Sequence, residues 1–140
     1  MPLPKTPLLT TDCVIFDGRA RVLLIRRKNE PFRGDYALPG GFVDIGETTA
    51  ASCRREVLEE VGIVVDRLRL VGVYSDPSRD PRGHAVSVAY TTRFGEAPTP
   101  KAGSDAEAAE WVKDWRTKQL AFDHSLIIAD AEKLCGERLK

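Results

Sequence analysis

Three glutamates, Glu56, Glu59 and Glu60, stand at positions i, i+3 and i+4 in a stretch whose apolar residues recur at spacings of three and four. If this stretch is helical, a rotation of about 100° per residue gathers the three carboxylates on one face. Like charges at this spacing repel, at a cost of roughly 0.2–0.5 kcal/mol per exposed i,i+4 pair. A hard divalent cation such as Mg²⁺ suits the cluster, because it prefers oxygen ligands and completes its shell with water and substrate phosphate oxygens.

An acidic run on a helix is most often only a solvated face, and the letters EVLEE alone favour that simpler interpretation. The context favours a metal site, because the opposite face of the stretch is apolar and the acids are not spread around it. The adjacent glycines Gly40 and Gly41 leave a backbone carbonyl open to close approach. Arg55 precedes Glu59 by four residues and relieves part of the repulsion.

The acidic stretch is expected to form a helix that begins after Thr48 and ends at Gly62. Thr48 has the side chain of an N-cap, and Gly62 stands where a helix-ending glycine belongs. The apolar stripe of this helix consists of Ala50, Cys53, Val57 and Val61.

The segments before the helix predict strands. Residues 13–16 and 21–27 are apolar runs joined by the turn signal Asp17-Gly18, which indicates a β-hairpin. Residues 1–10 hold three of the nine prolines and are expected to form an extended lead-in.

The segments after the helix continue the pattern. Residues 63–76 and 85–94 are rich in β-branched residues and predict strands, and a short strand is expected around Trp111. A second helix is expected from about residue 122 to 139. Strands with one inserted and one terminal helix indicate an α/β or α+β layered fold, organised as a single domain over residues 1–140.

The composition limits the classes of function. Lys+Arg and Asp+Glu both number 21, so the formal net charge is zero. Proteins that bind nucleic acid through its phosphates usually carry an excess of basic residues, which this chain lacks. The cysteines Cys13, Cys53 and Cys135 match no zinc or redox spacing, which favours reduced structural thiols. No signal peptide or membrane-spanning stretch is found. We therefore expect a soluble cytoplasmic protein with no nucleic-acid or membrane partner.

Residues 41–63 resemble the Nudix box, G-x5-E-x7-R-E-U-x-E-E-x-G-U, in which U is a bulky aliphatic residue. Every defined position is filled at the required spacing, and nine fixed positions within 23 residues make the match far more specific than a lone glycine motif. The matching residues are Gly41, Glu47, Arg55, Glu56, Val57, Glu59, Glu60, Gly62 and Ile63.

The resemblance implies a three-layer α/β/α sandwich around a mixed β-sheet, in which the box forms a loop, a helix and a loop. In this family the glutamates that match Glu56, Glu59 and Glu60 coordinate divalent metals, here expected to be Mg²⁺ or Mn²⁺. The carbonyl of the glycine that matches Gly40 often joins them.

The remaining box residues are expected to be architectural. The residues that match Glu47 and Arg55 are usually paired and hold the loop against the helix, and Glu47 is also a possible outer metal ligand. Gly41 and Gly62 are assigned structural roles.

The reaction implied is attack of water on one phosphorus of a nucleoside diphosphate joined to another group. The metals neutralise phosphate charge and help convert water to hydroxide. Glu59 or Glu60 could accept the proton, although both are already expected to bind metal. Several family members use a carboxylate from a later loop, for which Asp105 and Glu107 are the candidates. We choose Glu107, the simpler alternative being that it is a solvated loop acid.

The loop after the box suggests the substrate. Pro77 lies 15 residues past Gly62, which resembles the ADP-ribose pyrophosphatase branch of the family. That branch converts ADP-ribose to AMP and ribose 5-phosphate, and its members are often homodimers. Cationic or donor side chains suit a diphosphate or a terminal phosphoribose, the alternative being that they only solubilise the loop. The predicted substrate-binding residues are Arg33, Pro77, Arg79, Arg82 and His84.

The aromatic residues and the second histidine carry weaker expectations. Phe32 and Tyr36 flank the entry to the glycine pair and could stack on an adenine, although loop aromatics more often pack. His124 is expected to cap or pack rather than act as a base. Trp111 and Trp115 are expected in the core or at its rim.

Other functions stay open. Within the same enzyme family, NADH, another nucleotide sugar or an oxidised dNTP are alternative substrates. A non-catalytic ADP-ribose sensor belongs to another class, but such proteins typically carry a DNA-binding extension and often a degraded box. A purely structural acidic helix in an interaction module would make the complete box a coincidence.

Overall fold

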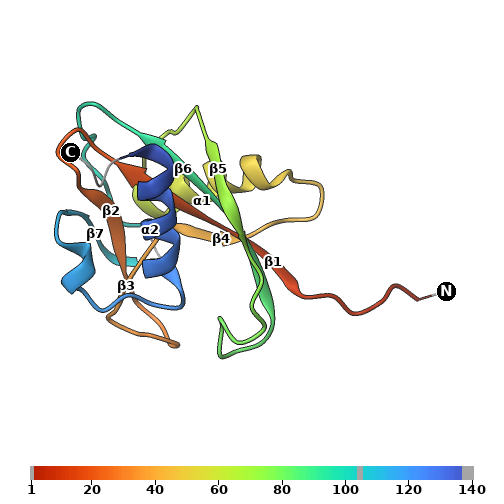
Figure 1. Ribbon diagram of the computed structural model, residues 1–140. Coiled ribbons are helices and arrows are strands. Elements are labelled where there is room, and N and C mark those ends of the chain that lie inside the picture. Colours follow the sequence, from red (N-terminus) through yellow and green to blue (C-terminus); the bar gives the residue numbers. More distant parts are fainter. Residues whose placement is uncertain (1, 104–105, 137–140) are drawn as a thin grey trace.

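A mixed seven-stranded β-sheet lies between two helices in the computed structural model, which describes residues 2–103 and 106–136 (Figure 1). The elements are β1 (Leu8–Phe16), β2 (Val22–Arg27), β3 (Tyr36–Ala37), β4 (Gly40–Phe42), α1 (Thr49–Val61), β5 (Arg69–Tyr74), β6 (Ala85–Arg93), β7 (Ala106–Val112), the 3₁₀ turn η1 (Trp115–Thr117) and α2 (His124–Cys135).

Strand β1 organises the sheet. It pairs in parallel with β6 along its whole length, whereas all other strand pairs are antiparallel. The order is β3-β2-β1-β6-β5, with β7 added to β2 and β4 added to β1. The sheet is therefore mixed, as the resemblance implied.

The sheet splits between β1 and β2. These strands are in register only at Phe16 and Val22, close to the hairpin turn, and then diverge. The segment 36–42 enters the gap, so that β3 pairs with β2 and β4 pairs with β1. The split opens one end of the sheet and places the backbone of the Gly40–Gly41 pair at its edge.

Each face of the sheet is covered by one helix. Cys13 of β1 packs with Val57 of α1, whereas the adjacent Val14 packs with Ile127 of α2. Alternate residues of a strand point to opposite faces, so this division places the sheet between the helices. The predicted three-layer α/β/α sandwich is confirmed.

The limits of α1 are those expected. The Thr48 hydroxyl accepts a hydrogen bond from the backbone N–H of Ala51 at 3.1 Å, and Gly62 adopts the left-handed conformation with φ of 68°. An N-cap threonine contributes about 1 kcal/mol to helix stability. Both ends of the acidic helix are thus determined by local chemistry.

Three boundaries differ from expectation. Strand β1 begins at Leu8, inside the predicted lead-in, because the prolines stop at residue 7 and the parallel ladder with β6 continues to that point. Residues 63–68 form no strand, although Ile63 and Val65 alternate into the core. Helix α2 begins at His124 because Phe122 has a φ of 53°; the expected turn at 137–139 lies outside the described residues.

The three cysteines are free thiols, as expected, and two of them are buried. None of the helices in the described part of the chain has the length and apolar character needed to cross a bilayer.

Candidate active site

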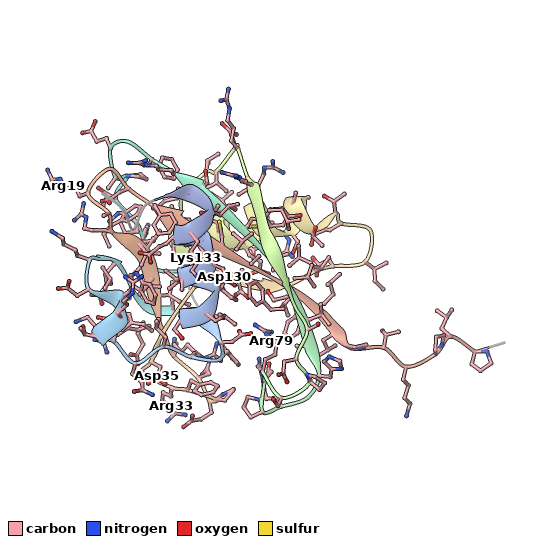
Figure 2. The ribbon with its side chains drawn as sticks, in the orientation of Figure 1. Arg19, Arg33, Asp35, Arg79, Asp130 and Lys133 are labelled. Atoms are coloured by element: carbon pink, nitrogen blue, oxygen red, sulfur yellow. The ribbon has the colours of Figure 1, made fainter. Side chains whose placement is uncertain are left out.

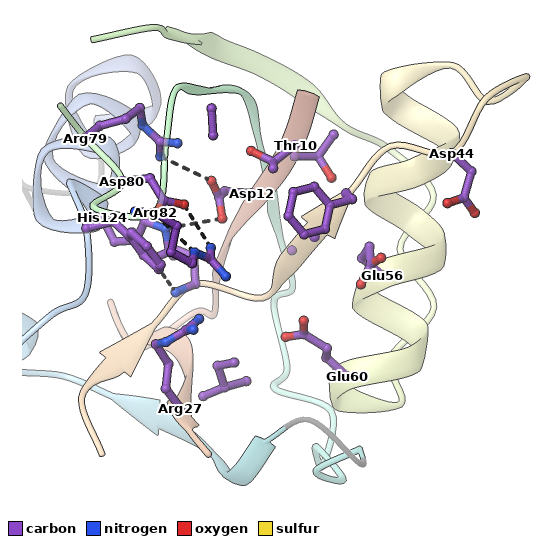
Figure 3. Close-up of a pocket in the computed structure, with 18 residues that line it drawn as sticks. Thr10, Asp12, Arg27, Asp44, Glu56, Glu60, Arg79, Asp80, Arg82 and His124 are labelled. Atoms are coloured by element: carbon purple, nitrogen blue, oxygen red, sulfur yellow. Dashed lines mark hydrogen bonds and ion pairs between the residues drawn. The ribbon is translucent and has the colours of Figure 1, made fainter. Parts of the chain in front are cut away.

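A cleft of about 420 Å³ opens at the split end of the sheet (Figure 3). Its walls come from β1, β2, β4, α1, the loop of residues 75–84 and the start of α2. The lining residues are Thr10, Thr11, Asp12, Ile25, Arg27, Leu38, Gly40, Gly41, Phe42, Asp44, Glu56, Glu60, Arg79, Asp80, Arg82, Ala85, Phe122 and His124.

Glu56 and Glu60 form the acidic side of the cleft, one helical turn apart on α1 (Figure 3). The Glu56 side chain is only 15% exposed and accepts a hydrogen bond from Arg55 Nη1 at 2.9 Å. Burial raises the pKa of Glu56, although Arg55 opposes the change. The Oε2 atom of Glu60 is also buried. These are desolvated, hard oxygen donors of the kind that a divalent cation binds.

The two glycines of β4 are required by close approach. A Cβ on Gly40 would lie 2.1 Å from the carbonyl oxygen of Thr11, and a Cβ on Gly41 would lie 2.5–2.7 Å from the carboxylate atoms of Glu56. Both glycines belong to strand β4. The absence of a side chain lets β1 approach Gly40 and lets the Glu56 carboxylate approach Gly41. The neighbouring Thr11 hydroxyl is buried and has no hydrogen-bond partner among the described residues.

Arg55 joins the box loop to α1. Its Nε and Nη2 donate to the two oxygens of Glu47 at 2.7 and 2.8 Å, while Nη1 donates to Glu56. The hydrogen bonds from Arg55 lower the pKa of Glu47 to about 2, with the backbone N–H of Asp44 contributing. The structure thus places Glu47 and Arg55 together, in the arrangement expected of a loop-to-helix clamp.

The third box glutamate lies apart from the other two. Glu59 is 57% exposed, contacts Arg55 at 3.3 Å and does not line the cleft. Across residues 2–103 and 106–136 there is no group of three Asp, Glu, His or Cys side chains already arranged around a metal position. The expected three-glutamate cluster is therefore not preformed, and two of its members reach the cleft.

The predicted general base is not brought to the cleft. Glu107 is exposed on β7, at an irregularity where Ala106 pairs with Arg27 and Ala108 with Arg26. A base must come within hydrogen-bonding reach of the reacting water, directly or through one water. The competing candidate, Asp105, lies outside the described residues.

The predicted substrate-binding residues divide into two groups. Arg79 and Arg82 line the cleft, whereas Arg33, Pro77 and His84 are exposed and do not. Figure 2 shows Arg33 projecting from the loop before β3, away from Arg79. The sequence did not distinguish these groups, because only the part of the loop of residues 75–84 from Arg79 to Arg82 lines the cleft.

Arg79 has a structural partner. Its side chain is 5% exposed, and its Nε and Nη2 donate to the Asp123 carboxylate at 2.9 and 2.7 Å, with Asp12 3.9 Å away. These bonds use the donors that a phosphate would need. Arg79 therefore fixes the loop to the start of α2, and the sequence interpretation of Arg79 as a free phosphate ligand is not supported by its contacts.

Asp12 and His124 were not expected to meet. Asp12 accepts a hydrogen bond from Ser87 Oγ at 2.5 Å and lies 3.3 Å from His124 Nε2. The backbone N–H of Leu38 donates to His124 Nδ1 at 3.0 Å, which assigns the ring proton of the neutral form to Nε2. Burial lowers the pKa of His124, although Asp12 opposes it. His124 is therefore buried with a contact at each ring nitrogen, which fits the packing role predicted for it, and it also lines the cleft.

Two aromatic residues, Phe42 and Phe122, line the cleft. Phe32 packs edge-on against Phe122 with ring centroids 4.8 Å apart, and Tyr36 is buried against α2, so neither of the predicted stacking residues lines the cleft. Trp115 lies in the core beside α2, and Trp111 packs partly buried on the α1 side. No local signal distinguished Phe122, because its position depends on the turn before α2.

Comparison with known proteins identifies similar chains. A family model described as the NUDIX domain matches residues 6–129. The ADP-ribose pyrophosphatase of Methanocaldococcus jannaschii is 45% identical over 126 residues, which cover 89% of this chain and 72% of that protein. The ADPR responsive transcriptional repressor NtrR of Acinetobacter baylyi is 35% identical over 133 residues, which cover 90% of this chain but only 53% of the repressor.

Among solved structures, the NUDIX domain of Shewanella oneidensis NrtR complexed with ADP ribose superimposes with a TM-score of 0.87 at 31% identity. The match covers 94% of this chain and 90% of that domain. The fold of this chain is thus shared with a solved NUDIX domain over nearly its whole length.

Proposed function

This chain belongs to the Nudix family, and from that premise we propose that it is a divalent-metal-dependent hydrolase that cleaves ADP-ribose to AMP and ribose 5-phosphate. The observation that carries the proposal is the cleft itself, in which the box glutamates Glu56 and Glu60 face the arginines Arg27 and Arg82 (Figure 3). One side suits a cation and the other suits phosphate. The 45% identity to an ADP-ribose pyrophosphatase supports the choice of substrate.

The box residues at the cleft have separate proposed roles. Glu56 and Glu60 would hold Mg²⁺ or Mn²⁺, with the Gly40 carbonyl and Glu59 as the further ligands that the family resemblance implies. The bound ion would neutralise diphosphate charge and acidify a water molecule. Arg55 orients Glu56 through the 2.9 Å hydrogen bond and is itself held by Glu47. Of the predicted proton acceptors within the described residues, only Glu60 lines the cleft, so it is a stronger candidate than Glu59 or Glu107.

The test is phosphate release across ADP-ribose, NADH, ADP-glucose and diadenosine polyphosphates, with and without Mg²⁺. For 8-oxo-dGTP, whose terminal phosphate a phosphatase removes directly, pyrophosphate release is measured without the phosphatase. A coupled phosphatase releases phosphate from AMP and ribose 5-phosphate but not from ADP-ribose, which has no terminal phosphomonoester. We expect Mg²⁺-dependent release with ADP-ribose as the preferred substrate. Preference for another member of the panel would keep the hydrolase and replace the substrate.

A sensor function is the second candidate, because the repressor NtrR and the ADP-ribose-bound NrtR domain are similar to this chain. The chain spans about half the length of that repressor. The complete box favours catalysis. Tight binding of ADP-ribose without turnover of any substrate, at saturating Mg²⁺ or Mn²⁺, would favour the sensor.

We also propose that the protein works in the cytoplasm as a homodimer. Strand β5 is an edge strand of the sheet, and its residues Leu70 and Val73 are more than half exposed. An exposed apolar edge strand can bind a second copy of the chain. Light scattering during size-exclusion chromatography measures the mass, and a value near 15.5 kDa would exclude the dimer.

A further inference from the structure

Three arginines line the cleft, and two of them are paired with carboxylates inside the protein. Arg79 is bound by Asp123, and Arg82 donates from Nε and Nη2 to Asp80 at 3.1 and 2.8 Å. Arg27 differs. Among the residues that the structure describes, its side chain makes one hydrogen bond, from Nε to the Pro31 carbonyl at 2.7 Å, and no carboxylate is in ion-pair contact with it.

Arg27 is also sheltered from solvent. Its guanidinium carbon lies 5.0 Å from the centroid of the Phe122 ring, and that of Arg82 lies 5.7 Å from the same ring. Burial, followed by the nearby charge of Arg82, lowers the pKa of Arg27, although the charges of Glu60, Asp80 and Asp35 oppose the change. A partly desolvated cation without a contacting counter-charge is costly unless a ligand supplies one. Two guanidinium groups beside one aromatic ring therefore favour an anion between them.

We propose that Arg27 is the phosphate-binding residue of the cleft, facing Glu56 and Glu60 from the opposite wall (Figure 3). The inference rests on the proposed function and adds to it the residue that receives the substrate diphosphate. The forked Nη donors of arginine match the oxygens of a phosphate. The Pro31 hydrogen bond through Nε holds the side chain in place while leaving both Nη groups for a ligand.

The adjacent residue offers a matched control. Arg26 carries the same charge on the same strand, but its Nη2 donates to Tyr36 at 3.0 Å and its guanidinium lies 4.4 Å from the Tyr36 ring centroid, outside the cleft. Arg26→Met changes the net charge as Arg27→Met does. Only the second variant alters the proposed site.

The experiment is calorimetric titration with inorganic pyrophosphate in EDTA, so that neither metal nor turnover contributes. We expect Arg27→Met to weaken pyrophosphate binding by about tenfold or more, as loss of a charge-assisted hydrogen bond does. Arg26→Met should bind as the wild type does. Wild-type affinity in folded Arg27→Met, equal losses in both variants, or no binding by the wild type would each overturn the proposal.

Two further measurements separate the possible failures. Melting curves show whether Arg27→Met folds; if it does not, Arg27→Gln, which keeps an amide donor for the Pro31 carbonyl, is titrated in its place. Arg27-dependent pyrophosphate binding in a protein that hydrolyses none of the panel would refute the proposed function and support the phosphate site. Unchanged kcat/KM for ADP-ribose in Arg27→Met would support the function and refute the site.

Discussion

Arg79 and Asp123 are 44 residues apart in sequence, yet they form a two-bonded ion pair that fastens the loop of residues 75–84 to the start of α2. The pair is largely withdrawn from solvent, since the Arg79 and Asp123 side chains are 5% and 21% exposed. One wall of the cleft therefore depends on a contact between a loop and a helix, and the stability of the fold and the shape of the cleft are coupled at this point.

Replacing Arg79 by methionine should destabilise the fold by about 2–4 kcal/mol, because it leaves the Asp123 and Asp12 carboxylates without their shared counter-charge. Urea denaturation measures the loss, with Arg82→Met, at the half-exposed position, as the control expected to cost much less. Combining Arg79→Met with Asp123→Asn tests the pairing. If the free energies of unfolding lost in Arg79→Met and in Asp123→Asn simply add in the double variant, the ion pair does not contribute as described.

The Glu47–Arg55 clamp should make stability depend on pH in the acid range. The pKa of Glu47 is lowered from 4.5 to about 2, so the folded state binds the proton more weakly than the unfolded state. The stabilisation is therefore fully present above about pH 4.5 and is lost as the pH falls toward 2.

Denaturation midpoints between pH 2.5 and 7 measure this effect. Glu47→Gln should be less stable than the wild type at pH 7, and the difference should narrow as the pH falls. Glu107→Gln, an exposed change away from the clamp, should follow the wild-type curve. A constant gap between Glu47→Gln and the wild type at all pH values would contradict the assignment.

Gly41→Ala should impair function far more than folding. The new Cβ would meet the Glu56 carboxylate at 2.5–2.7 Å, and the far end of a flexible side chain can move aside at modest cost. Overpacking of this kind costs about 1–3 kcal/mol. Displacing a carboxylate that is proposed to bind the metal by about 1 Å can reduce turnover by roughly 100-fold. The Mg²⁺ concentration for half-maximal activity should rise as well.

Gly95→Ala is the control, because a Cβ there would meet no atom within 4 Å and the backbone needs no positive φ. It should leave both melting temperature and metal response unchanged. Equal activity in Gly41→Ala and Gly95→Ala would show that the position of Glu56 is not critical.

Features that depend on neighbouring residues could be predicted from the sequence. Thr48 and Gly62 determine the ends of α1 through contacts within one turn, and the spacing of the box identified the acidic helix. The β-branched residues of 63–76 predicted a strand that the structure has only over Arg69–Tyr74. Ile63 and Val65 are buried without being in a strand, because a strand also needs a second segment to pair with, and composition does not show where that segment lies.

Features that depend on packing between distant elements could not be predicted. Glu59 and Glu60 are adjacent in sequence, and only the packing of Val57 and Val61 against the sheet turns Glu60 toward the cleft and Glu59 toward solvent. The role of Arg27 likewise depends on the divergence of β1 and β2, which opens the cleft beside it.

This difference between neighbouring glutamates gives the sharpest test of the catalytic assignment. Glu60→Gln removes a charge that faces the cleft while keeping the shape of the side chain, so it should reduce kcat by at least about 100-fold, as loss of a metal ligand or base does. EDTA should abolish wild-type turnover, and Mg²⁺ or Mn²⁺ should restore it.

Glu107→Gln serves as the comparison, because Glu107 was the base predicted from sequence and the structure places it outside the cleft. Its kcat should stay within about twofold of the wild type, since surface changes remote from a site rarely perturb it. Steady-state kinetics on ADP-ribose, with melting curves to confirm folding, measure both variants. A large loss in Glu107→Gln together with normal kcat in Glu60→Gln would reverse the two roles: β7, which carries Glu107, would then have to approach the cleft when substrate binds.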